Sequence, residues 1–105
     1  PTAVYAGKPG AGEHNYHIYN QYVIHVPQRD KLRQFLQENS IGCEVYYPLC
    51  LHQQECLHSE AYARQLFPFA EQAAHNSLAL PIFPELAPEQ LEYVVATVKR
   101  FYHGD

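Results

Sequence analysis

The sequence lacks the features that mark several large classes of protein. It has no apolar run long enough to cross a bilayer, so we expect no membrane segment. Its formal net charge is -4 and it has no cluster of basic residues, which argues against a nucleic-acid surface. It begins without a charged-then-apolar signal pattern, and its three cysteines cannot all pair with one another. We therefore expect a reducing, cytoplasmic location.

Common catalytic and binding patterns are missing too. The run GKPGAG at 7–12 lacks the preceding strand, the following helix and the Lys-Ser/Thr ending of a phosphate-binding loop. There is no paired-carboxylate signature and no internal repeat. The chain has seven histidines, so a thiol near an imidazole carries little meaning without a third group that orients the base. Spacing alone thus predicts no catalytic residue.

What is present fits one small globular domain. Of the 105 residues, 47% are hydrophobic and 17% are charged, which is ordinary for a folded domain with a modest core. Residues 1–13 are rich in glycine, have no periodicity and begin without methionine. We interpret this segment as a linker that enters from an upstream part of a longer protein, and residues 14–105 as the domain.

The hydrophobic pattern predicts an α+β domain with two layers. Apolar residues alternate in three segments and recur with helical period in three others. The expected strands are 16–26, 43–47 and 78–82, and the expected helices are 29–39, 67–77 and 88–101. Because strands and helices alternate and every helix has an apolar face, we expect a sheet of about three strands packed against the helices.

Each predicted helix has an identifiable face. The first buries a stripe of large side chains, the second presents small ones that allow close approach to a sheet, and the third has the widest apolar stripe. Pro88 fits the first position of the third helix, although Ala87 offers no capping oxygen. In order, the three faces are Leu32, Phe35, Leu36; Ala70, Ala73, Ala74, Ser77; and Leu91, Val94, Val95, Val98, Phe101.

The stretch IGCEVYYPLCLHQ, from Ile41 to Gln53, is the candidate site. Pro48 has no N–H to give a neighbouring strand, so it ends the preceding extended segment. Tyr46 and Tyr47 before it and His52 after it suit a polar pocket at the end of a strand. The alternative is that the tyrosines are half-buried strand residues and that the histidine lies on a solvated loop.

Two other features leave alternatives open. Asn20 interrupts an apolar strand face, which indicates a bulge, a buried amide or a polar group presented to a ligand. Cys50, His52, Cys56 and His58 form C-x-H-x3-C-x-H, whose residue types all bind zinc, although the spacing differs from the usual zinc knuckle. A small zinc-stabilised interaction domain is therefore a second interpretation.

Three pieces carry a resemblance to a known family. They are YNQYVIHV with the Arg-Asp helix behind it, YYPLCLHQ, and SLALPIFPEL before the last helix. In this order and spacing they resemble the C-terminal domain of the DegT/DnrJ/EryC1/StrS family of pyridoxal-phosphate-dependent sugar aminotransferases, from about His14 onward. Tyr46 stands where the family often has histidine, and Cys50 where proline is common. The first departure affects sugar contacts and the second affects loop stiffness.

The resemblance implies a fold like the small domain of fold-type I aminotransferases. Such an enzyme is a homodimer that transfers an amino group, typically from glutamate, to a nucleotide-linked keto-sugar. The lysine that carries pyridoxal phosphate belongs to a large N-terminal domain, and this chain has only Lys8, Lys31 and Lys99. We therefore expect this chain alone to be inactive and to bind no cofactor.

The same resemblance implies a role in substrate binding. The residues expected to contact the nucleotide-sugar are Tyr46, Tyr47, His52, Asn20 and Gln21. A free-standing sugar-binding module with the same fold is the alternative.

Overall fold

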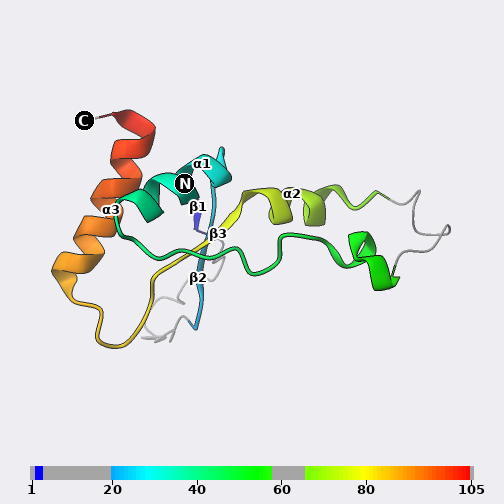
Figure 1. The fold of residues 1–105 in the computed structure, drawn as a ribbon, viewed down its shortest axis with the longest axis horizontal. Coiled ribbons are helices and arrows are strands. Elements are labelled where there is room, and N and C mark those ends of the chain that lie inside the picture. The colour runs from blue at the N-terminus through cyan, green and yellow to red at the C-terminus, as the bar shows by residue number, and fades with distance from the viewer. Residues whose placement is uncertain (1, 4–19, 58–65, 105) are drawn as a thin grey trace, which may run out of the picture.

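The computed structural model describes residues 2–3, 20–57 and 66–104 of the chain. Within these ranges, two short 3-10 turns, η1 and η2, accompany three α-helices and three strands (Figure 1). In chain order the elements are β1 Thr2–Ala3, β2 Tyr22–His25, α1 Arg29–Glu38, η1 Leu51–Gln53, η2 Glu55–Leu57, α2 Pro68–Asn76, β3 Ser77–Leu80 and α3 Pro88–His103. The predicted α+β class is confirmed. None of the helices in these ranges is long and apolar enough to cross a membrane.

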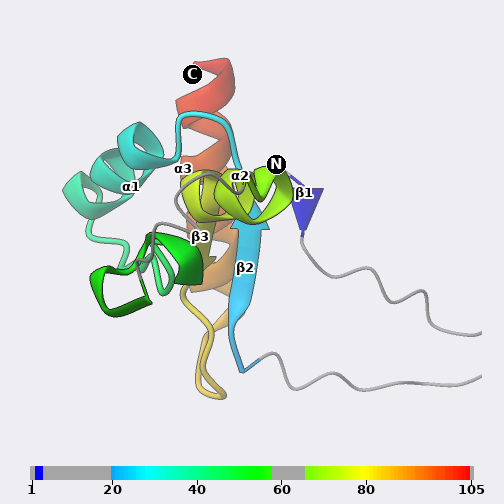
Figure 2. The same ribbon diagram turned by 90° about the vertical axis from the view of Figure 1, so that its right-hand side faces the viewer.

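The sheet is built on the antiparallel pair β2 and β3. Tyr22 lies opposite Leu80 and His25 lies opposite Ser77, and β1 adds two residues on the other edge of β2 (Figure 2). Ile24 and Val26 are buried and Tyr22 packs against the same core, which confirms this part of the predicted strand face. The first part of the strand predicted over 16–26 lies outside the described residues, and residues 20–21 form a bend.

The predicted strand at 43–47 is wrong, because only Glu44 pairs with β3. The Glu44 N–H donates to the Ala79 carbonyl at 3.1 Å, and the Ala79 N–H donates to the Glu44 carbonyl at 2.8 Å. In an antiparallel ladder the next pairs would join residue 46 to Ser77 and residue 42 to Pro81. Pro81 has no N–H, and the Ser77 carbonyl already accepts a hydrogen bond from Arg29 at 2.9 Å. The ladder therefore ends after one bridge.

The predicted count of about three strands is consequently not confirmed. The main pair consists of two four-residue strands, and the two residues of β1 come from the segment predicted to be a linker. The predicted boundary between residues 13 and 14 lies outside the described ranges, so the division into linker and domain stays a prediction.

Helices α1 and α3 pack together over the core, while α2 and the two 3-10 turns project to the other side (Figure 1). Leu32 and Leu36 of α1 are fully buried, as predicted. Phe35 is half-buried and its ring lies 5.6 Å from the ring of Phe101. The buried cluster joins both helices to the sheet and consists of Ile24, Val26, Leu32, Leu36, Ile41, Cys43, Leu78, Val94 and Val98.

The predicted apolar face of α3 is partly wrong. Val94 and Val98 are buried, but Leu91 is 52% exposed and Val95 is 44% exposed. Thr97 takes a buried position instead, and its hydroxyl donates to the Tyr93 carbonyl at 2.7 Å. The helix therefore contacts the core through a narrower stripe than its apolar residues span. Thr97 can be buried in that stripe because its hydroxyl is satisfied within the helix.

Arg29, the first residue of α1, connects α1 to the junction between α2 and β3. Its side chain is 8% exposed, and its Nη1 donates to the carbonyls of Ala74 at 3.0 Å and Ser77 at 2.9 Å. The last carbonyls of a helix have no partner within it, and a cation there also complements the helix dipole. Since α2 runs into β3 without a loop, Arg29 fixes the direction in which α2 leaves the sheet.

Replacing Arg29 by methionine should lower the free energy of unfolding by about 2–4 kcal/mol, because two buried carbonyls lose a charged donor. Urea denaturation of the chain measures this loss. The matched control is Lys31→Met on the exposed side of the same helix, which should change stability by less than about 0.5 kcal/mol. Equal losses in the two variants would contradict the role assigned to Arg29.

Candidate functional site

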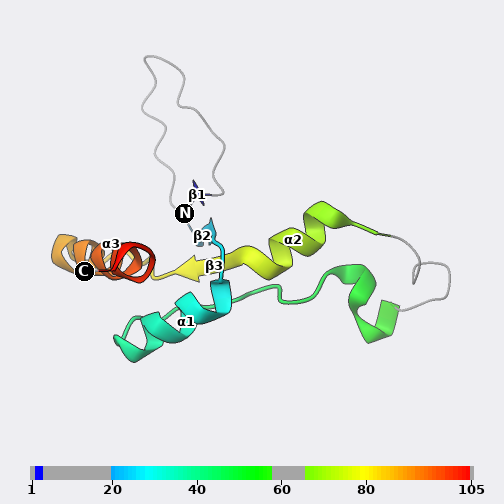
Figure 3. The same cartoon turned by 90° about the horizontal axis from the view of Figure 1, so that it is seen from above.

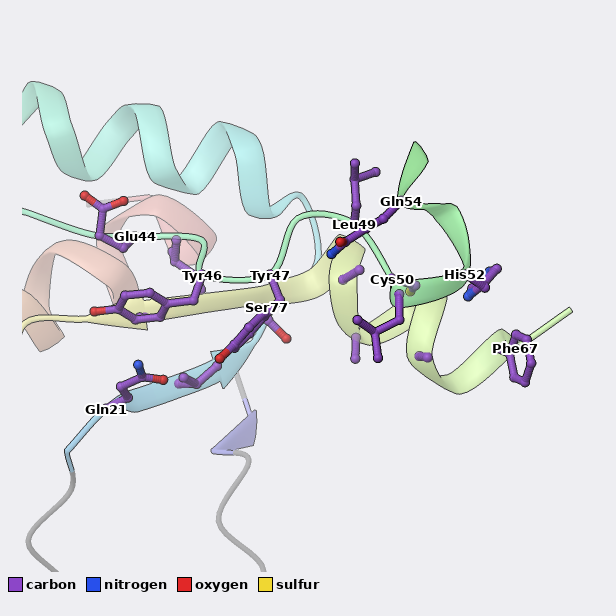
Figure 4. Close-up of a pocket in the computed structure, with 17 residues that line it drawn as sticks. Gln21, Glu44, Tyr46, Tyr47, Leu49, Cys50, His52, Gln54, Phe67 and Ser77 are labelled. Carbon is purple, nitrogen blue, oxygen red and sulfur yellow. The ribbon is translucent and has the colours of Figure 1, made fainter. Parts of the chain in front are cut away.

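A groove of about 780 Å³ opens beside the sheet (Figure 4). Its floor is formed by β2 and β3, and its two walls are α2 and the segment 44–54, which run side by side away from the sheet (Figure 3). The volume is in the range of ordinary ligand pockets. Four of the five predicted site residues line it, namely Gln21, Tyr46, Tyr47 and His52. Asn20 is exposed and lies outside this lining.

The shape of the groove follows from the small side chains of α2. Ala70, Ala73 and Ala74 all lie on the wall that faces the segment 44–54. The sequence predicted that this small face would allow close approach to a sheet, and Ala74 is indeed buried near the strands. Ser77, predicted to end the helix, instead begins β3. The small face therefore leaves open space for the groove as well as packing against the sheet.

Two tyrosines and an amide define one end of the groove. Tyr46 and Tyr47 extend from the segment 44–54 at the end where Gln21 and Ser77 also lie (Figure 4). Their side chains are 51% and 77% exposed, so their rings and hydroxyls are available to a ligand. The Ser77 hydroxyl lies 3.3 Å from Nε2 of His25. This end presents aromatic surface and neutral hydrogen-bonding groups, with the Glu44 carboxylate beside Tyr46 (Figure 4).

His52 and α2 meet at the other end. Nε2 of His52 lies 3.0 Å from Oε1 of Glu71, and the two side chains are 16% and 28% exposed. The His52 ring lies 4.8 Å from the ring of Phe67, whose backbone N–H also donates to Glu71 at 3.4 Å. The His52 side chain is thus half-buried and contacts Glu71 and Phe67, so it does not lie on a solvated loop. Its contact with Glu71 joins η1 to α2 across the groove.

The sequence analysis missed Phe67 and Glu71 as site residues. They lie four residues apart at the start of α2, where an acidic side chain complements the helix dipole. That pattern alone indicates only a stabilised helix start. The pairing with His52, 19 positions away in sequence, depends on how the segment 44–54 runs back along α2.

The described residues do not bring the proposed zinc ligands together in one cluster. Among the described residues no three His, Cys, Asp or Glu side chains cluster as metal ligands, and His58 lies outside those residues. Cys43, Cys50 and Cys56 are free thiols.

Burial raises the pKa of the Cys43 thiol; the Arg33 guanidinium acts against this and Glu44 acts with it. Burial also raises the pKa of Tyr102, whose hydroxyl donates to the Pro27 carbonyl at 2.7 Å.

The groove does not by itself fit pyridoxal phosphate. No lysine is among the described residues that line the groove, and Lys31 and Lys99 are exposed on α1 and α3. Lys8 lies outside the described ranges. Without an amine that can form a Schiff base, this part of the chain offers the cofactor no covalent anchor.

Comparison with known proteins decides the family. The model of the DegT/DnrJ/EryC1/StrS aminotransferase family matches residues 3–99. The chain belongs to this family. The resemblance stated from the three sequence pieces is therefore confirmed.

The relatives that this chain matches are much longer than the chain. A "Pleiotropic regulatory protein" from Geobacillus stearothermophilus is 48% identical over 87 residues, which are 83% of this chain and 23% of that protein. A UDP-N-acetyl-3-dehydro-alpha-D-glucosamine 3-aminotransferase from Acidithiobacillus ferrooxidans is 35% identical over 94 residues, which are 90% of this chain and 24% of that protein. The chain thus spans about a quarter of the length of these relatives.

A solved structure shares the fold. DesV of S. venezuelae, crystallised in complex with a ketimine intermediate, superposes with a TM-score of 0.73 at 29% identity. The match covers 79% of this chain and 22% of DesV.

Replacing Glu71 by alanine should free the segment 44–54 from α2, because it removes the partner of His52. The backbone N–H groups of Gln53 and Gln54 donate within the η1 turn to Cys50 and Leu51. They should exchange hydrogen about 5–10-fold faster, as expected when the turn loses roughly 1 kcal/mol of local stability. Hydrogen exchange followed by NMR measures this. Glu92→Ala, at an exposed acid on α3, is the control and should leave both amides unchanged. Unaltered exchange in Glu71→Ala would contradict the proposed contact across the groove.

Proposed function

We propose that this chain is the C-terminal domain of a longer pyridoxal-phosphate-dependent nucleotide-sugar aminotransferase and forms one wall of its substrate site. The intact enzyme transfers an amino group from glutamate to a nucleotide-linked keto-sugar. The observation that carries the proposal is the groove, which brings Gln21, Tyr46, Tyr47 and His52 together on a chain of this family. The printed name of the relative from A. ferrooxidans, a UDP-sugar aminotransferase, supports the class of substrate.

The proposal divides the work between two domains. A large N-terminal domain supplies the Schiff-base lysine, and bound pyridoxal phosphate supplies the electron sink. This chain supplies contacts to the nucleotide-sugar, so on its own it neither binds the cofactor nor transaminates. The absence of lysine from the groove lining supports this division.

The exposed apolar surface near the groove supports a missing partner domain. Leu66, just before α2, is 81% exposed, Phe69 in its first turn is 86% exposed, and Leu51 of η1 is 71% exposed. Surfaces of this kind mark contacts with other protein. We propose that the large domain and the second subunit of a homodimer cover this side. The free thiols support a cytoplasmic enzyme.

Within the groove, the tyrosine hydroxyls and the Gln21 amide act as hydrogen-bond partners for the substrate, and His52 shapes the opposite end. Asn20 stays a prediction, since it is exposed beside Gln21 but not part of the lining.

A free-standing sugar-binding module is the second candidate, because the whole groove is formed by residues of this chain. The coding sequence upstream of Pro1 distinguishes the two. A large domain with a Schiff-base lysine supports the aminotransferase, and a start codon directly before Pro1 supports the module.

In the full-length protein, Tyr47→Phe and His52→Ala should each raise the KM for the nucleotide-sugar several-fold. Tyr47→Phe removes a hydroxyl that contacts the substrate, and His52→Ala removes the contact that shapes the opposite end of the groove. Neither side chain is assigned a contact with the amino donor, so the half-reaction with the donor should keep its rate. Steady-state kinetics and stopped-flow cofactor absorbance measure the two quantities. Tyr93→Phe, on α3 away from the groove, is the control and should change neither. A slower donor half-reaction with an unchanged sugar KM would show that the roles are misassigned.

A further inference from the structure

We propose that the end of the groove formed by Tyr46, Tyr47 and Gln21 receives the hexose ring of the nucleotide-sugar, and that the diphosphate binds outside this groove. This inference rests on the proposed function and specifies which part of the substrate this chain holds.

The charge of the groove excludes the diphosphate. Among the described residues that line it there is no lysine or arginine, and one of them, Glu44, is acidic. Protein sites for phosphates normally use Arg or Lys side chains or the start of a helix. Two arginines of the described chain are already engaged, Arg29 with the end of α2 and Arg100 with Asn39 and the Phe35 ring. The doubly charged diphosphate would therefore have no lysine or arginine partner among the described lining residues.

The start of α2 is not a phosphate site either. Its first turn carries Glu71, whose carboxylate accepts the Phe67 N–H, and this negative charge repels an anion. Nε2 of His52 is 3.0 Å from the same carboxylate, and its ring packs against Phe67. These contacts hold the imidazole at this end of the groove, so it is not available to neutralise a phosphate.

The tyrosine end suits a neutral, hydroxyl-rich ring. A hexose presents C–H groups on its faces, which pack on aromatic rings, and hydroxyls around its edge, which bond phenol and amide groups. Tyr46 and Tyr47 offer exposed rings and hydroxyls, and Gln21 offers an amide (Figure 4). Ala73 and Ala74 give the opposite wall an apolar surface of small side chains. All of these groups are uncharged, as is the sugar.

The test compares two ligands that differ only in the sugar. Calorimetry on the full-length protein measures the Kd of a nucleotide-hexose and of the nucleoside diphosphate alone, using UDP-N-acetylglucosamine with UDP, or dTDP-glucose with dTDP, whichever pair the wild type binds. Tyr47→Leu should weaken the nucleotide-hexose about tenfold and the diphosphate by less than about twofold. Tyr93→Leu, outside the groove, should change neither value.

Two milder variants keep the test decisive if Tyr47→Leu does not fold. Tyr47→Phe retains the ring, and Gln21→Ala changes an exposed side chain; each should weaken only the nucleotide-hexose, by about two- to threefold. Equal weakening of both ligands would overturn the inference, because it would place the nucleotide or diphosphate in the groove. Failure of the wild type to bind either ligand of either pair would overturn the proposed function, and this inference with it.

Discussion

The contact between Arg29 and the end of α2 is the constraint on which both walls of the groove depend. The guanidinium holds the carbonyls of Ala74 and Ser77 at the junction where α2 becomes β3, so it sets the direction of the helical wall. Because it takes the Ser77 carbonyl, it also helps to end the pairing between β3 and the segment after Glu44. That segment leaves the sheet before Tyr46, and both tyrosines are thereby presented to the groove. One buried side chain thus connects the packing of α1 to the geometry of the site.

The resulting groove is a binding surface without a reactive centre among the described residues. Its aromatic and amide groups lie at one end, and the His52–Glu71 contact closes the other. Neither end offers an amine or a guanidinium. In the enzyme we propose, such a surface recognises the shape and polarity of the sugar, while groups from elsewhere supply the chemistry and bind the phosphates. This division agrees with a chain that spans about a quarter of the length of its relatives in a family of aminotransferases.

The sequence predicted the helices well because their signals are local. Periodicity and proline positions placed α1, α2 and α3 close to their observed bounds, and alternation identified the buried face of β2. The composition of 43–47 favours a strand, but pairing there depends on Arg29 and Pro81, which no local window contains. Tyr46, Tyr47 and His52 are predicted as site residues from their own segment and the family pattern, and all three line the groove. Glu71 was missed because its partner lies 19 residues away, and only the folded chain brings the two together.

The most direct test of this account is to locate the amino group that carries pyridoxal phosphate in the full-length protein. Borohydride reduction of the purified holoenzyme fixes the cofactor to its lysine, and mass spectrometry of the peptides then identifies that residue. The account predicts a lysine upstream of Pro1, with Lys8, Lys31 and Lys99 all unmodified. Modification of any one of these three would contradict it, because this chain would then take part in the chemistry and not only in the proposed binding of the sugar.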